Sequence, residues 1–456
     1  MRWIDIILPE PTNHPELDMH LAKATGLAAK IPAIQETHGL DSVRVLEVME
    51  QAGREIFQGL VTLNPGTFSP TKGASSGETP VLGRPEHDDL VGYHIVADEK
   101  WVGMPWTWLH NGVAFLFEKH PVCSSTSGSR LPAGDLNRPW MQRLTRAQFL
   151  VGEDGGDTLQ ETLSQLRPEN AGLPELLFVP GHSDRERRKL IYREAELIEA
   201  ALEHGCRGET LINLDLPVEP VTPSDLIKQG FQYQAIHFAG PTSKPARSSD
   251  PDGEFWMNRL IEETTLPEAQ ELEDAIGLAG EVLGVDPVTS LLDDIVERYE
   301  NADPVLDPVS VSPGGSATVG GDGRTHVGGN AGGTNLPNTP SRSWLLDDGP
   351  VHPEHLERGG ALPPLVFSNS YLAMSTLGNR FVRAGASTFI GPVAPLFSRP
   401  ARRFAGHCYT ALGQGWCTGA AVWKAAQECR QELGNEHPAW LSYGVQGYGQ
   451  LSLQYL

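Results

Sequence analysis

Hydrophobic and polar positions follow two different periods along the first part of the chain. Over residues 41–60 the apolar side chains recur every three or four positions behind an Asp-Ser start, which predicts an amphipathic helix. Shorter apolar runs at 90–97 and 113–117 predict two strands, one on each side of a compact aromatic segment from Met104 to His110. The aromatic side chains of that segment are expected to be anchors of the core.

From about residue 173 onward, apolar runs alternate with helical patterns. Runs without polar alternation, separated by helices, are typical of a parallel sheet that is covered on both faces. The pattern therefore predicts a three-layer α/β fold with a mostly parallel central sheet flanked by helices. The expected strands are 176–179, 209–216, 233–238, 365–368, 388–393 and 441–445, and the first of them are separated by expected helices at 184–204 and 224–229.

One long stretch interrupts this alternation. Residues 251–300 contain fourteen Asp or Glu against two Arg, with apolar positions at helical spacing, and predict an acidic helical insertion over 242–311. The next segment, 312–341, holds nine glycines and is expected to be a flexible loop, because it cannot bury enough apolar area to offset the entropy of ordering. The domain itself is expected to consist of two parts, 1–241 and 342–456.

Charge and cysteine content narrow the classes of function. The chain has 35 Lys or Arg against 58 Asp or Glu, a formal charge of −23, and nucleic acid is not an expected partner because such a surface repels phosphates. The five cysteines lie far apart without a C-x-x-C pair, which favours reduced thiols in the cytoplasm. No apolar run reaches the ~20 residues of a membrane span, no signal-peptide pattern is present, and no zinc-ligand or phosphate-loop spacing occurs, so we expect no membrane, metal or cofactor.

Six segments, taken in chain order, share their pattern with one protein family. Residues 102–110 read V-G-M-P-W-T-W-L-H, residues 233–241 read Y-Q-A-I-H-F-A-G-P, and residues 364–373 read P-L-V-F-S-N-S-Y-L-A. They resemble L-P-W-E-L-L-H, D-x-x-H-F-A-G-H-G and L-V-x-L-N-A-C-x-S of CHAT domains, prokaryotic relatives of caspases and separases. The resemblance implies a caspase-like fold from about residue 100 to 450 outside the insertion. It continues through the segments 384–395, 404–426 and 438–447.

The resemblance also assigns the two catalytic positions of such cysteine peptidases. The dyad histidine of the family falls on Pro241, and its nucleophilic cysteine falls on Tyr371. Proline cannot take up a proton, and a phenol with a pKa near ~10 is un-ionised at pH 7. The resemblance thus implies an inactive pseudopeptidase whose old cleft, with Tyr371, Asn369 and His237 as binding residues, holds a protein without cutting it. The expected partner is an active CHAT peptidase or its substrate, in a bacterial defence or signalling assembly.

The alternative is an active hydrolase with a displaced nucleophile. Ser370 with His237, or Cys408 with His407, would supply the right groups. Adjacent residues point to opposite faces of a strand and about 100° apart on a helix, so neither set is expected to form a nucleophile and base pair. Cys408 is instead expected to be a small core residue. A third hypothesis is a purely structural domain without any ligand.

Overall fold

The fold was obtained as a computed structural model, and all residues described below belong to one unit of the chain, Met1–Glu263 with Thr334–Leu456. The predicted acidic insertion and glycine-rich loop lie outside the described residues, except Thr242. The described residues are 2–9, 13–38, 43–63, 90–101, 103–126, 175–181, 185–205, 212–217, 221–229, 233–240, 242, 343–346, 349–353, 356, 362–370, 372–396 and 398–450.

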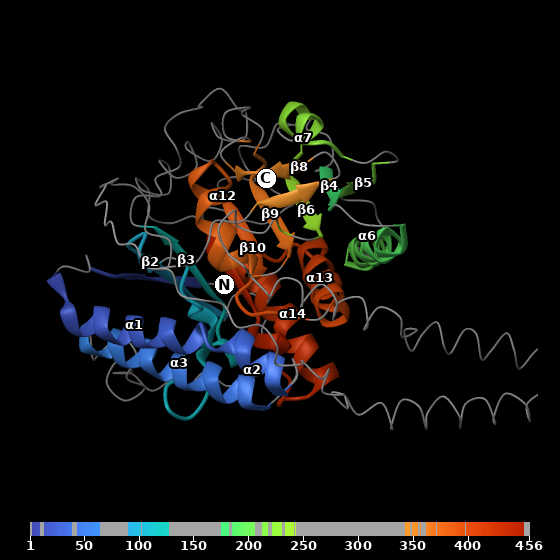
Figure 1. Cartoon of the computed structure of the whole chain (residues 1–456). Coiled ribbons are helices and arrows are strands. Elements are labelled where there is room, and N and C mark those ends of the chain that lie inside the picture. The colour runs from blue at the N-terminus through green and yellow to red at the C-terminus, as the bar shows by residue number, and fades with distance from the viewer. Residues whose placement is uncertain are drawn as a thin grey trace, which may run out of the picture. The chain divides into compact units, whose positions relative to one another are not determined.

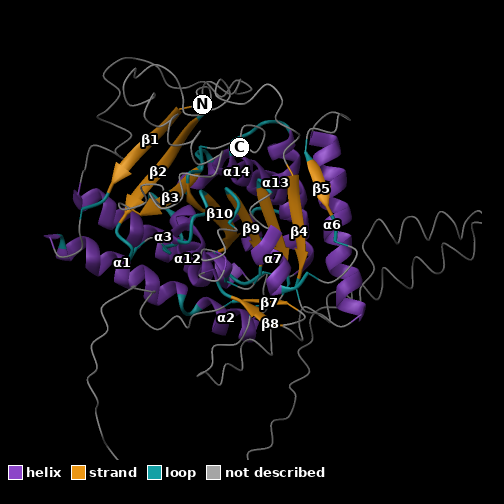
Figure 2. Ribbon diagram, turned by 90° about the horizontal axis from the view of Figure 1, so that it is seen from above, coloured by secondary structure: helices purple, strands orange, loops and turns teal. Residues whose placement is uncertain are grey.

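A nine-stranded sheet in the order β1-β2-β3-β11-β10-β9-β6-β4-β5 forms the centre of the fold (Figures 1 and 2). Every neighbouring pair is parallel except β10 and β11, so two parallel blocks run in opposite directions. The prediction of a mostly parallel sheet is confirmed. The strands are β1 (Arg2–Ile7), β2 (Val91–Ala97), β3 (Val122–Thr126), β4 (Glu175–Pro180), β5 (Asn213–Asp215), β6 (Ala235–Ala239), β9 (Leu365–Asn369), β10 (Thr388–Pro392) and β11 (Tyr443–Gly447), with a separate hairpin of β7 (Trp344–Leu346) and β8 (Gly349–Val351).

Helices flank the sheet, as the alternating pattern predicted (Figure 2). Successive strand residues face opposite sides, so each face builds its own apolar cluster. Phe178 and Phe367 belong to one cluster with residues of α6 and α13, whereas Phe238 and Val366 belong to another with Phe381 of α12. The helices are α1 (Pro15–Ala28), α2 (Ile31–His38), α3 (Val43–Leu63), α6 (Arg185–Gly205), α7 (Pro223–Gln229), α12 (Asn379–Arg383), α13 (Ser398–Gly413) and α14 (Thr418–Leu433).

One predicted strand is wrong. Residues 113–117 form a turn and the short 3-10 helix Leu116–Glu118, and Val113 at the turn is 89% exposed. The cause is Asn111, whose side-chain oxygen accepts hydrogen bonds from the backbone of Val113 and Ala114, both at 2.9 Å, and so closes the turn.

The aromatic segment that precedes this turn is buried, as predicted. Trp106 and Trp108 are 3% and 0% exposed. Trp108 Nε1 donates a hydrogen bond to the carbonyl oxygen of Leu441, 2.8 Å away. This bond joins two segments of the family resemblance, 102–110 and 438–447, across the fold.

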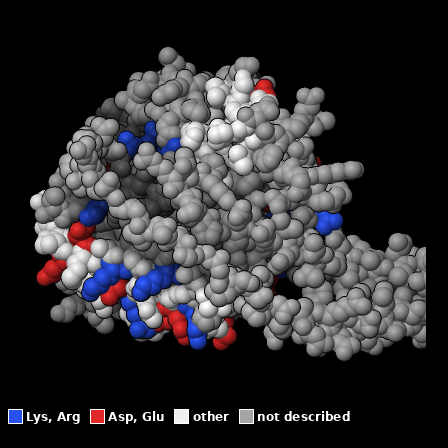
Figure 3. Space-filling model, viewed as in Figure 1, with Lys and Arg blue, Asp and Glu red and all other residues white. Residues whose placement is uncertain are grey.

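Charged side chains of both signs are interspersed over the surface of α1 and α3 (Figure 3). Lys100 Nζ lies 2.5 Å from Asp18 Oδ1, and Lys23 Nζ lies 3.9 Å from Glu55 Oε2. Within the described ranges, no helix is long and apolar enough to cross a membrane. The same ranges contain no group of three or more His, Cys, Asp or Glu side chains placed to hold a metal ion.

Candidate functional site

The candidate site lies where the neighbouring parallel strands β6 and β9 end. Their last residues, Ala239 and Asn369, are register partners, so both strands stop at the same level of the sheet. Pro241 and Tyr371 each follow two residues later in sequence. Both positions lie outside the described residues, and their assignment as former catalytic positions stays a prediction.

Glycine is required next to this edge for a steric reason. Gly181, just after β4, donates its backbone N–H to the carbonyl oxygen of Ala239 at 2.8 Å. A Cβ atom on Gly240 would lie 2.6 Å from the Cα atom of Gly181. The H-F-A-G segment therefore ends in glycine because a side chain would separate the ends of β4 and β6.

His237 points into the core, towards α6 and α13. Its ring is fully buried between the rings of Phe178 and Phe367, with centroids 5.3 and 4.8 Å away. Its Nε2 atom lies 2.8 Å from Glu194 Oε1, and its Nδ1 atom lies 3.1 Å from the Tyr409 hydroxyl oxygen. Both ring nitrogens are thus occupied inside the protein.

Asn369 contacts the same carboxylate. Its Nδ2 atom donates to Glu194 Oε1 at 2.6 Å, and its Oδ1 atom accepts a hydrogen bond from the Tyr443 hydroxyl at 2.5 Å. Burial, together with nearby negative charge, raises the pKa of Tyr409 and of Tyr443 well above the usual value for a phenol, so both hydroxyls keep their protons. We refer to Glu194, His237, Asn369, Tyr409 and Tyr443 as the Glu194 network.

Ser370 belongs to the opposite face of the sheet. Its Oγ atom lies 2.8 Å from Ser368 Oγ, which also accepts a hydrogen bond from Trp344 Nε1 at 2.9 Å. The Trp344 indole stacks on Phe238, which faces away from the cluster that contains Phe367. The sheet therefore separates Ser370 from His237 and does not bring them together as a pair.

His407 and Cys408 are adjacent on α13 but have different environments. His407 Nε2 lies 3.0 Å from Glu432 Oε1, without hydrogen-bond alignment, and Arg403 binds the same carboxylate at 2.9 Å. Cys408 is fully buried, and burial raises the pKa of its thiol far above the ordinary value, with a smaller contribution from Cys429. Since only a thiolate is an effective nucleophile, this environment is that of a core cysteine.

We expect Cys408 in the folded chain to be alkylated by iodoacetamide at least about 100-fold more slowly than in the urea-unfolded chain. Burial blocks the reagent, and the raised pKa suppresses the thiolate. The measurement is site-resolved mass spectrometry of a time course at pH 8. Equal rates in the folded and unfolded chain would show that Cys408 is accessible.

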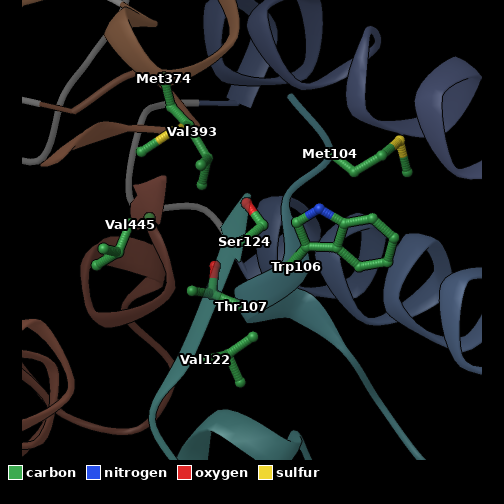
Figure 4. Close-up of a pocket in the computed structure, with 9 residues that line it drawn as sticks. Met104, Trp106, Thr107, Val122, Ser124, Met374, Val393 and Val445 are labelled. Carbon is green, nitrogen blue, oxygen red and sulfur yellow. The ribbon is translucent and has the colours of Figure 1, made fainter. Parts of the chain in front are cut away.

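A small cavity lies between β3, β11 and the aromatic segment (Figure 4). It has room for about one water molecule. Thr107 Oγ1, which borders it, makes no hydrogen bond within the described part of the chain. Met374, which lines the cavity, belongs to a segment with an unusual backbone: Leu372 has a φ of 47°, and Met374–Gly378 is π-helical. Such backbone features concentrate at functional sites. The residues that line the cavity are Met104, Trp106, Thr107, Val122, Ser124, Met374, Val393, Gly444 and Val445.

Sequence reasoning missed Glu194, which organises the site. In the sequence it belongs to a charged stretch of α6 that is typical of a solvated face, yet Glu194 is only 6% exposed. The signal was its spacing: Glu194 lies four residues before the buried Ile198, on the apolar stripe of the helix. A carboxylate on such a stripe needs a buried polar partner, and His237 is that partner.

No family model and no curated protein matches the chain. The chain is similar to two solved structures. One is the complex of the Porphyromonas gingivalis RgpB pro- and mature domains, and the other is the Arg-specific cysteine proteinase gingipain R (RgpB). Each is 11% identical with a TM-score of 0.39 over 99% of this chain, and the matches cover 79% and 78% of the respective gingipain chains.

Proposed function

We propose that the chain is a caspase-like pseudopeptidase of the CHAT type, a cytoplasmic protein that binds a protein partner at its former catalytic edge without cleaving it. The observation that carries this proposal is the environment of His237. The histidine retained from the H-F-A-G motif has both ring nitrogens engaged in the Glu194 network and is fully buried. It is therefore no substitute for the base that the family has at position 241.

The nucleophile position supports the same proposal. Tyrosine stands at 371, and its neighbour Ser370 hydrogen-bonds to Ser368 on the face opposite His237. Nucleophilic catalysis needs a base within hydrogen-bond reach of the nucleophile. The described residues at this edge hold no such pair, which favours binding over cleavage.

The test of inactivity is a peptidase assay on the purified full-length chain with a complex peptide library, read by mass spectrometry. We expect no cleavage above the buffer control, and the same result for Ser370→Ala and His237→Ala. Robust cleavage by the natural chain would refute the pseudopeptidase proposal. Its loss in Ser370→Ala, at an unchanged urea unfolding midpoint, would establish a displaced nucleophile, and loss in His237→Ala counts only if that variant is shown to be folded. Cleavage that is identical in all three chains would place any activity elsewhere in the molecule.

The binding half of the proposal needs a separate measurement. Affinity purification from the native host, followed by mass spectrometry, should recover a specific protein, and an active CHAT peptidase or its substrate is the expected partner. The recovered protein should then bind the purified chain directly and stay intact during prolonged incubation. If the purified chain binds none of the recovered proteins directly, the proposal of a partner-binding protein is wrong, and the hypothesis of a purely structural domain takes its place.

A further inference from the structure

A serine and a histidine form a hydrogen-bonded pair in a different part of the sheet. His94 on β2 and Ser125 on β3 are joined by a contact of 2.8 Å between Nε2 and Oγ. The two side chains are 7% and 4% exposed. This is the geometry in which an imidazole can take the proton from a serine hydroxyl, and the low dielectric of a buried position strengthens the contact.

Ser125 lies near the carboxyl end of its parallel block, and His94 lies in the middle of the neighbouring strand β2. β1, β2 and β3 run opposite to β6 and β9, so their carboxyl ends lie at the other end of the sheet from Ala239 and Asn369. Ser125 is the last residue but one of β3. Ligands of open parallel sheets bind outside the carboxyl ends of the strands, so Ser125 lies near the end of the sheet at which a ligand would approach.

The strand register indicates a route of approach. Ser125 pairs with Val96, and Val96 pairs with Ile7, so the three residues form one row across the sheet. Ile7, at the edge of the sheet, is 74% exposed, and Val96 is partly exposed. The apolar side chains of Ile7 and Val96 therefore extend from the exposed edge of the sheet to Ser125. In the preceding row, the register partner of His94 on β1 is Asp5.

We propose that Ser125 and His94 form a second site, a serine nucleophile with its base, that hydrolyses esters with a small apolar acyl group. Ser125 Oγ attacks the acyl carbon while His94 Nε2 takes the hydroxyl proton. The ester C–O bond then breaks, and the leaving alcohol receives that proton from His94. A water molecule, deprotonated by His94, attacks the acyl-serine and releases the carboxylic acid, which restores both side chains. The low exposure of Ser125 limits the acyl group to a small one, and Ile7 and Val96 favour an apolar one.

The test uses a fluorophosphonate probe, which reacts with activated serine hydroxyls, on the full-length chain. We expect the folded natural chain to be labelled at Ser125, as mapped by mass spectrometry, and the heat-unfolded chain to stay unlabelled. Ser125→Ala should abolish this label, and His94→Gln should slow it at least about 100-fold, because the base is lost. The rate of p-nitrophenyl acetate hydrolysis should decrease in the same two variants, relative to the natural chain.

Ser124 offers a matched control, since it is the preceding residue and borders the cavity on the other face of the same strand. Ser124→Ala should be labelled at the natural rate. An unlabelled natural chain, or a label that persists in Ser125→Ala, would overturn the proposal. The urea unfolding midpoint of each variant shows whether a loss of label is caused by misfolding. Labelling of the natural chain at Ser125 tests the proposal without any variant.

Discussion

Replacement of Glu194 by alanine is expected to lower the free energy of unfolding by about 2–6 kcal/mol, because two buried groups lose their hydrogen-bond partner at about 1–3 kcal/mol each. The carboxylate oxygen accepts from His237 Nε2 at 2.8 Å and from Asn369 Nδ2 at 2.6 Å. Both donors would lose this partner next to the stacked rings of Phe178 and Phe367, where a lost hydrogen bond is not replaced by bulk water.

Urea unfolding, followed by far-ultraviolet circular dichroism, measures this loss as a shift of the midpoint at constant slope. Glu199→Ala is the matched control, because Glu199 lies on the same helix and is exposed, and its effect should stay within about 0.5 kcal/mol. Glu194→Gln keeps one carbonyl oxygen as an acceptor, so its free energy of unfolding should decrease less than that of Glu194→Ala. If Glu194→Ala unfolds at the same midpoint as Glu199→Ala, the network contributes nothing to stability.

The Glu194 network gives His237 a structural role that does not depend on catalysis. It links α6, β6, β9, α13 and β11 through hydrogen bonds of 2.5 to 3.1 Å. A change at position 241 or 371 leaves all of these bonds in place, whereas a change of His237 would leave the buried Glu194 without one donor. Under the pseudopeptidase proposal, the fold needs His237 although catalysis does not.

Local patterns were sufficient to predict most of the sheet. The apolar run at 176–179 and the helix at 184–204 correspond to β4 and α6, and the helix at 41–60 corresponds to α3. β1 and β3 were missed, because Asp5 interrupts the first apolar run and Ser124, Ser125 and Thr126 fill most of the second. In β3 all five residues are buried, so tertiary packing overrides a polar sequence there.

The sequence placed the candidate site at the ends of two strands, and the structure shows that these strands are neighbours, but the contacts of the site residues were not predictable. The motif alignment placed His237 and Asn369 near each other, and the parallel register of β6 and β9 confirms that the two strands end together. Alternation along a strand shows that adjacent residues face opposite sides, but not which helix covers each side. The contact of His237 with Glu194 depends on the packing of α6 against the sheet, which no local pattern encodes.

Gly53→Ala is expected to destabilise the fold by about 3 kcal/mol or more, the upper range for a group forced into a packed core. A Cβ atom at Gly53 of α3 would lie 1.7 Å from the carbonyl oxygen of Trp108 and 3.1 Å from Cβ of His110. The Gly53 carbonyl oxygen also accepts the backbone N–H of His110 at 3.3 Å. A shift of this backbone would strain the bond from Trp108 to Leu441, so the clash has no inexpensive relief.

A second helical glycine separates this steric effect from the general effect of glycine in helices. Gly26 of α1 is exposed, and a Cβ atom there would meet nothing within 4 Å. Gly26→Ala should therefore stabilise the chain by about 0.5–1 kcal/mol, because alanine loses less backbone entropy on folding. The two variants should shift the urea midpoint in opposite directions. Equal shifts of the same sign would mean that the aromatic segment does not pack on α3 at Gly53, and the bridge between segments 102–110 and 438–447 would then need another explanation.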